Sequence, residues 1–80
     1  MVQAYILIQT EVGKAREVAL AIQDITGVVR VDAVTGPYDV VVRIGAATSD
    51  DLQNTVVPSV QQVAGITRTL TCPIAAGARP

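Results

Sequence analysis

The chain has 80 residues, 50% of them hydrophobic, and its six Lys and Arg and seven Asp and Glu residues give a net charge of −1. The basic residues form no cluster, so the sequence lacks the positive surface that binds nucleic-acid phosphates. Histidine is absent and Cys72 is the only cysteine, which excludes an internal disulfide and removes the commonest general base and metal ligands. We expect no enzyme activity, no metal and no cofactor.

Two further observations concern the compartment. Every apolar run is far shorter than the roughly 18 residues that a membrane span needs. Residues 1–4 carry no basic side chain of the kind with which a secretory signal begins. The sequence therefore predicts a cytoplasmic protein without a membrane partner.

The first half of the chain predicts a strand, a helix and a strand. Residues 2–9 form a β-branched run that favours a strand, and residues 28–35 repeat this pattern. Between them an apolar stripe at spacings of three and four predicts a helix that begins at Thr10 or Glu11 and ends at a left-handed Gly27. The stripe consists of Ala15, Val18, Ala19, Ile22 and Ile25.

The second half begins with a hairpin. Gly36-Pro37 indicates a turn, so residues 38–44 should pair with the strand before them. Ser49 is a suitable N-cap for a second helix. Pro58 predicts a kink within that helix, and Gly65 should end it.

The last strand, residues 66–74, completes the order βαββαβ. We expect one domain over residues 1–75 and a flexible tail over residues 76–80. Residues 25–30 resemble residues 63–68, so each half reads strand, helix, glycine, strand. Two such units predict an α+β fold of the ferredoxin-like type, a four-stranded antiparallel sheet that carries both helices on one face.

Two helices can cover only one face of this sheet. Alternation places apolar side chains on the other face too, and we assign Tyr5, Leu7, Val28, Val34 and Val41 to it. At about 25 cal/mol per Å² of apolar surface, leaving that face in water would forfeit several kcal/mol. The sequence therefore predicts a homodimer in which a second copy covers the face.

Gly36, Tyr38 and Asp39 give the predicted turn its chemistry. One interpretation is structural: the tyrosine packs and the carboxylate caps backbone N–H groups. The other is functional: a phenol and a carboxylate stand beside a turn whose backbone a ligand can approach closely. The residues alone leave both interpretations open.

Thr67, Thr69 and Thr71 alternate along the last strand, so we expect their hydroxyls on one face. Threonine also favours strands for its shape alone, so the row is either a strand feature or the lining of a polar pocket.

Other polar residues stand within otherwise apolar strands. Arg30, Asp32 and Arg43 should share one face, where they form an ion-pair network between strands or subunits, or hold the carboxylate of an amino acid. Cys72 alternates with apolar residues and is expected to be buried.

Three segments resemble motifs of the effector-binding domain of the Lrp/AsnC transcription regulators. Thr26-Gly27-Val28 is similar to the pattern P-G-V, residues 34–39 are similar to V-T-G-x-Y-D, and residues 64–71 are similar to G-V-x-R-T-x-T. The resemblance covers about residues 2–75. Each motif alone is weakly specific, whereas their order and spacing together are specific.

The resemblance implies sheet-to-sheet homodimers that assemble into rings or discs, with amino-acid effector sites in the clefts between dimers. It places Gly36, Tyr38 and Asp39 in that cleft and the three threonines beside it. The family's helix-turn-helix has no room before Met1. We therefore expect a stand-alone amino-acid-sensing module that binds no DNA by itself and can co-assemble with full-length regulators.

Three other functions compete with this hypothesis. An ACT-type regulatory domain has the same order of elements and binds amino acids, but pairs its sheets side by side. A small dimeric ferredoxin-like enzyme needs a large polar or aromatic cavity, and the chain has no His, Trp or Phe. An RNA-binding domain of this topology needs stacking aromatics on its central strands. The turn motif favours the sensing module.

Overall fold

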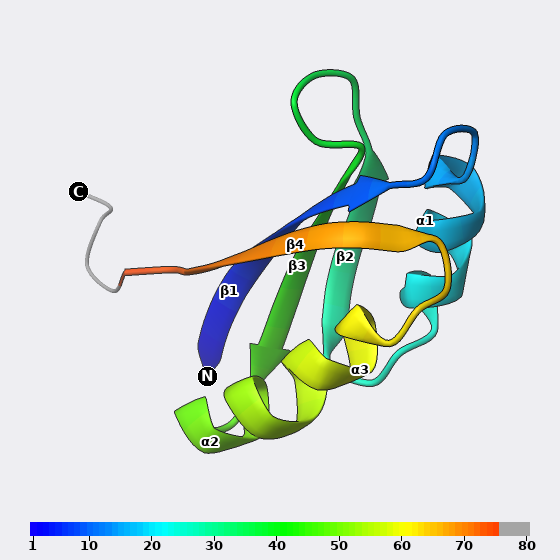
Figure 1. Ribbon diagram of the computed structural model, residues 1–80. Helices are drawn as coiled ribbons and strands as arrows, with labels where there is room; N and C mark the ends of the chain where they lie inside the picture. Colours follow the sequence, from blue (N-terminus) through cyan, green and yellow to red (C-terminus); the bar gives the residue numbers. More distant parts are fainter. Residues whose placement is uncertain (76–80) are drawn as a thin grey trace.

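The computed structural model describes residues 1–75, in which four strands form one antiparallel sheet of order β2-β3-β1-β4 (Figure 1). The strands are β1 (Val2–Thr10), β2 (Val28–Ala33), β3 (Val40–Ala46) and β4 (Ile66–Pro73). Helix α1 (Ala15–Gln23) joins β1 to β2, and a second helical segment joins β3 to β4. That segment consists of α2 (Ser49–Asp51), η1 (Leu52–Val56) and α3 (Val57–Gln61). The predicted ferredoxin-like βαββαβ fold is confirmed. The predicted tail, residues 76–80, lies outside the described residues.

The core lies between the sheet and the helices and consists of aliphatic side chains. Alternate residues of the two central strands are fully buried: Ala4, Ile6 and Ile8 in β1, and Val40, Val42 and Ile44 in β3. They pack with the buried residues of the helices, which are Val18, Ile22, Leu52, Val56, Val57 and Val60. Burial of each Val, Leu or Ile side chain in this set stabilises the fold by about 1.5–3 kcal/mol, so this interface fixes where the helices sit.

The helices differ from the predicted ones at their ends. Helix α1 stops at Gln23 and is followed by Asp24 as its C-cap, so Gly27 does not cap it. The N-cap of α2 is Thr48, not Ser49, because the hydroxyl of Thr48 accepts a hydrogen bond from the backbone N–H of Asp51 at 3.1 Å. Threonine, like serine, is among the residues preferred at this position.

Gly27 and Gly65 occupy equivalent places in the two halves of the chain. Both have a φ of +97°, and each directly precedes an edge strand. The carbonyl of Gly27 accepts a hydrogen bond from the N–H of Gly45 near the end of β3, and that of Gly65 accepts one from the N–H of Glu11 after β1, both at 2.8 Å. The resemblance between residues 25–30 and 63–68 is thus a structural repeat.

Each of these glycines also lies against the helix of the other half. A Cβ added to Gly27 would stand 2.7 Å from Cγ2 of Val56 in η1, and one added to Gly65 would stand 3.0 Å from Cγ2 of Val18 in α1. The first distance is shorter than real Cβ contacts and the second is at the tight end of their range, so the absence of a side chain lets the two halves pack closely.

Pro58 interrupts the second helix, as predicted. The N–H of Val57 donates to the carbonyl of Leu52, five residues earlier, which makes η1 a turn of π-helix. Proline has no N–H, and its ring would clash with the carbonyl four residues before it in a regular helix. The widened turn precedes Pro58, which then stands in the first turn of α3.

The sheet face opposite the helices, hereafter the open face, carries the apolar residues Tyr5, Leu7, Val41, Leu70 and Cys72. Leu7 lies directly between Val41 and Leu70, and Tyr5 lies opposite Cys72. Tyr5 is 40% exposed and Leu70 is 47% exposed. The prediction that the sheet has a second apolar face is confirmed for Tyr5, Leu7 and Val41.

Two assignments to this face were wrong. Val28 lies opposite the buried Ile44 and packs against the core, because a bulge between Val28 and Arg30 shifts the register of β2 by one residue. Val34 lies beyond the end of β2, in the connection to β3.

The substitution Gly27→Ala tests the close approach between the halves. Its methyl group would collide with Val56 at a φ of +97°, whereas Gly13→Ala puts a methyl group into open space at a φ of +80°. Both variants strain the backbone, but only the first overpacks the core. We expect Gly27→Ala to lower the free energy of unfolding by about 1–3 kcal/mol more than Gly13→Ala in urea denaturation. Equal losses would mean that Val56 moves aside without cost.

Candidate functional site

The connection between β2 and β3 is tied to the end of β1. The N–H of Asp39 donates to the carbonyl of Ile8 at 2.8 Å, and the N–H of Val34 donates to the carbonyl of Asp39 at 2.9 Å. The side chain of Gln9 donates from Nε2 to the carbonyl of Pro37 at 2.9 Å. Gly36 has a φ of +143°, which favours glycine. The turn therefore projects from the sheet as an anchored loop, prominent in Figure 1.

Asp39 caps the end of β1. Its Oδ2 accepts hydrogen bonds from the backbone N–H of Thr10 at 2.8 Å and from the Thr10 hydroxyl at 3.3 Å. This is the structural role considered from the sequence. Within residues 1–75, Oδ1 of the same carboxylate accepts no hydrogen bond, and the half-buried Tyr38 precedes it in the chain.

The three threonines of β4 do not share one environment. Thr69 and Thr71 lie opposite the fully buried Ile8 and Ile6, on the side of the helices. Thr69 accepts a hydrogen bond from Nε2 of Gln61 in α3 at 3.1 Å. Thr67 stands at a bulge that interrupts the alternation, and its hydroxyl donates to the carbonyl of Gln9 at 3.2 Å.

Gln9 joins the turn to β4, because its side chain bonds to Pro37 while its carbonyl bonds to Thr67. The structure thereby brings Gly36, Tyr38, Asp39 and Thr67 to one end of the sheet. Thr69 and Thr71 continue away from that end along the edge strand.

The charged residues of the open face pair differently from the predicted network. Arg30 donates from Nε to Oδ2 of Asp32 at 2.9 Å within the same strand, and this hydrogen bond and the charge of Asp32 raise the pKa of Arg30. Arg43 donates from Nη2 to Oε1 of Gln3 at 2.6 Å, while its Nε is buried with no partner in the described chain. Cys72, which we expected to be buried, is half-buried on this face opposite Tyr5.

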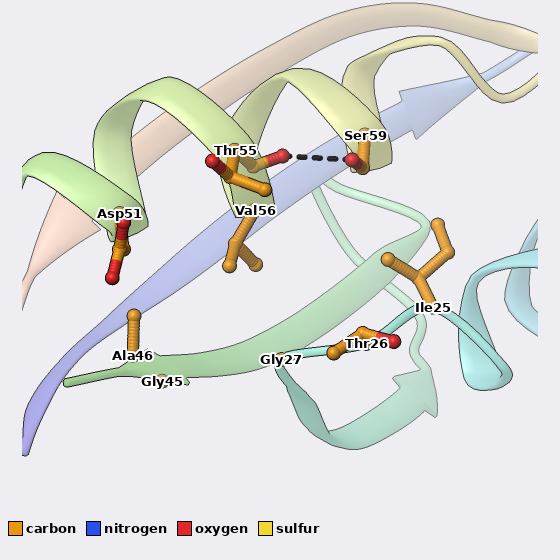
Figure 2. Close-up of a pocket in the computed structure, with 9 residues that line it drawn as sticks. All are labelled: Ile25, Thr26, Gly27, Gly45, Ala46, Asp51, Thr55, Val56 and Ser59. Carbon is orange, nitrogen blue, oxygen red and sulfur yellow. Dashed lines mark hydrogen bonds between the residues drawn. The ribbon is translucent and has the colours of Figure 1, made fainter.

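A concave pocket that the sequence did not indicate lies at the opposite end of the sheet (Figure 2). It has a volume of about 490 Å³ and lies between η1 and the strand ends at Gly27 and Gly45. Its residues come from several separate segments, so no local motif marks it. The glycine before β2 was the one available signal, and it was interpreted as a helix cap.

Residues 1–75 contain neither a metal-binding cluster nor a membrane-spanning helix. No three Asp, Glu or Cys side chains there are grouped so that they could hold a metal ion. No helix in this part of the chain combines the length and the apolar character needed to cross a membrane.

Comparison with known proteins identifies the class of protein to which this chain belongs. A family model described as the Lrp/AsnC ligand binding domain matches residues 3–75, which is nearly all of the described chain. The molecule is therefore a ligand-binding domain of the kind found in transcription regulators. The chain belongs to the Lrp/AsnC ligand-binding domain family, as its three motifs suggested.

Solved structures agree with this assignment. FFRP-DM1 is 31% identical, with 94% of this chain and 100% of that chain covered and a TM-score of 0.85. TTHA0845 from Thermus thermophilus is 30% identical, with 100% and 99% covered and a TM-score of 0.86. AsnC of E. coli shares the fold at 18% identity and a TM-score of 0.85, and the chain spans 54% of its length. The comparison with curated proteins gave no match.

Replacing Asp39 by alanine should separate its structural role from any other. The variant leaves the N–H of Thr10 without its acceptor, so we expect the free energy of unfolding to fall by about 1–3 kcal/mol. Asp24→Ala removes an exposed carboxylate after α1 and should change it by less than about 0.5 kcal/mol. Urea denaturation of both variants measures the difference. If Asp39→Ala were as stable as Asp24→Ala, the cap would not hold the turn.

Proposed function

We propose that this chain is an amino-acid-sensing module of the Lrp/AsnC type, which acts through oligomerisation and without catalysis. The observation that carries the proposal is the family match over residues 3–75. A structure with the same fold, 17% identical, is a transcriptional regulator of Neisseria meningitidis in complex with L-Met. That complex is the reason to test amino acids before other small molecules. As a regulator of transcription, the module would work in the cytoplasm.

The proposed effector site is the end of the sheet at Gly36, Tyr38 and Asp39. Oδ1 of Asp39 is a carboxylate oxygen that no described residue uses, and it can accept hydrogen bonds from the ammonium group of an amino acid. The Tyr38 phenol and the Thr67 hydroxyl stand at the same end of the sheet as further polar groups. We include Thr69 and Thr71 among the proposed ligand-binding residues because they lie further along β4, the strand that carries Thr67.

The proposed assembly is a homodimer that covers the open face. Tyr5, Leu7, Val41 and Leu70 form an apolar group on that face, and burying each would contribute up to about 1.5–3 kcal/mol. Dimers would then join into a ring or disc in which two turns face each other.

The proposed role in DNA readout is indirect. The six Lys and Arg residues form no cluster in the sequence, so neither helical segment carries the row of basic side chains that would hold DNA phosphates. FFRP-DM1 and TTHA0845 are matched over 100% and 99% of their lengths, so chains of this size carry the fold alone. DNA contact would then come from a full-length regulator that co-assembles with this module.

A charge on the open face should break the dimer. Leu70→Glu places a carboxylate on a residue that is 47% exposed on the open face, whereas Leu20→Glu does so on α1, where the leucine is 57% exposed. Light scattering at micromolar concentration should give a dimer or larger mass for the wild type and for Leu20→Glu, and a monomer mass for Leu70→Glu. A monomeric wild-type protein with an intact fold would contradict the proposed assembly.

Amino-acid binding can be screened with the intact protein by thermal shift and calorimetry. At least one of the standard amino acids at millimolar concentration should raise the melting temperature. Tyr38→Ala should weaken that binding about tenfold or more if the residue lines the site, while Thr35→Ala, on the exposed side of the same turn, should leave it within about twofold. The absence of a response to any amino acid would argue against this function.

A further inference from the structure

The pocket at the other end of the sheet has a definite construction (Figure 2). Gly27, Gly45 and Ala46 form one side, where the hydrogen bond between Gly45 and Gly27 holds the backbone of β3 against the start of β2. Asp51, Thr55, Val56 and Ser59 form the other side, with Ile25 and Thr26 between them. The volume of about 490 Å³ is within the range of small-molecule sites.

The polar side chains of this pocket are the carboxylate of Asp51 and the hydroxyls of Thr26, Thr55 and Ser59. Asp51, Thr55 and Ser59 follow one another at intervals of four residues and therefore line one side of the helical segment. In Figure 2 the carboxylate of Asp51 points towards Ala46, across the pocket. Ser59 donates from its hydroxyl to the carbonyl of Thr55 at 2.7 Å. Among the described lining residues none is basic, so the pocket has no cationic group for a carboxylate or phosphate.

The equivalent position in the first half of the structural repeat indicates which chemical group fits the pocket of the second half. In the first half, Lys14 lies four residues before Val18, the residue that packs on Gly65. The Lys14 Cβ would stand 3.5 Å from a Cβ at Gly65, and its Cγ 3.9 Å, so the lysine stem runs over that glycine. Its ammonium group reaches Glu17 at 3.5 Å.

In the second half the equivalent position is Asp51. It lies five residues before Val56, and the π-turn accounts for the extra residue. The two positions differ in their place at the helix start: Lys14 is the N-cap of α1, whereas Asp51 is the third residue of α2, and its N–H donates to the hydroxyl of the N-cap Thr48. Where the first half supplies an alkyl chain ending in an ammonium group, the second half supplies a short carboxylate beside an apolar pocket.

We infer that this pocket binds a small primary alkylammonium ion. The alkyl body packs against Ile25, Ala46 and Val56, and the ammonium group donates to the Asp51 carboxylate and the Thr55 hydroxyl. A free amino acid is disfavoured, because its carboxylate would stand close to Asp51 without a cation. The site lies at the opposite end of the sheet from the turn at Gly36–Asp39, so it is separate from the proposed effector site.

The test uses the full chain labelled with ¹⁵N and three probes of nearly equal shape: 3-methylbutylamine, leucine, which adds only the α-carboxylate, and 3-methylbutanol, which lacks the charge. At pH 7 and low ionic strength, the amine should shift the amide signals of Gly27, Gly45 and Ala46 in a saturable manner, in the millimolar range. Leucine and the alcohol should move these signals at least about fivefold less at equal concentration. Amides of the turn, such as those of Tyr38 and Asp39, report separately on the proposed effector site.

Two matched pairs of variants locate the interaction. Asp51→Asn and Asp50→Asn remove the same charge from neighbouring positions, but only Asp51 lines the pocket. We expect the first to weaken amine binding about three- to fivefold and the second less than about twofold. Ala46→Leu fills the pocket and should weaken binding about tenfold or more, whereas Ala47→Leu makes the same change at an exposed position outside it and should have no effect.

Several results would overturn the inference: no saturable shift with the amine, shifts of equal size with all three probes, or equal losses in Asp51→Asn and Asp50→Asn. Failure of the amino-acid-sensing proposal has a different signature, because it would leave the turn amides unmoved by every amino acid while the amine still shifts Gly27, Gly45 and Ala46.

Discussion

The side chains of the central strands β1 and β3 alternate between the two sides of the sheet, and the helices of residues 1–75 cover only one of these sides. Ile6, Ile8, Val42 and Ile44 are fully buried beneath the helices, whereas Tyr5, next to Ile6 in sequence, is 40% exposed on the open face. The period of two in a strand makes this division obligatory, since a side chain cannot move to the other face without a shift of register. The proposed self-association follows from that division.

The same constraint limits how the two halves can meet. Each half contributes one central strand, one edge strand and one helical segment, and the helices must sit close enough to the sheet to exclude water from an aliphatic core. Gly27 and Gly65 meet this requirement at the two crossing points, where a Cβ would collide with Val56 or crowd Val18. The glycines therefore act as contact points between the halves, a role that depends on their missing side chain as much as on their positive φ.

The repeat is imperfect, and its imperfection has a physical cause. Pro58 cannot continue a regular helix, so η1 widens by one residue before it. That extra residue places Asp51 where the first half has Lys14, and a short carboxylate covers less surface than a lysine stem does. Pro58 thus accounts for the widened turn that distinguishes two otherwise similar ends of the sheet, and widened turns of this kind recur at functional sites.

Strand and helix periodicity was enough to predict the order of elements, the burial of one sheet face and the irregularity at Pro58, because these depend on local patterns. The register of β2 was not predictable, since the bulge after Val28 depends on pairing with β3. The pocket was not predictable either, because residues as distant in sequence as Thr26 and Ser59 meet only in the folded chain. Local rules interpret a glycine as a helix cap and a proline as a kink. In this fold Gly27 and Gly65 also mark the close packing between the two halves.

Asp39 illustrates why the candidate site could be found from sequence while its chemistry could not. From sequence, a carboxylate next to Gly-Pro-Tyr is either a backbone cap or a ligand contact. In the fold, Oδ2 is used by the N–H and hydroxyl of Thr10, so the cap is real, and it orients the other oxygen. A carboxylate fixed through one oxygen loses little further entropy when a ligand binds the other, so capping would prepare the group for the proposed ligand contact. The two interpretations are therefore not alternatives: the structural bond is what would give the turn a fixed acceptor at the edge of the sheet.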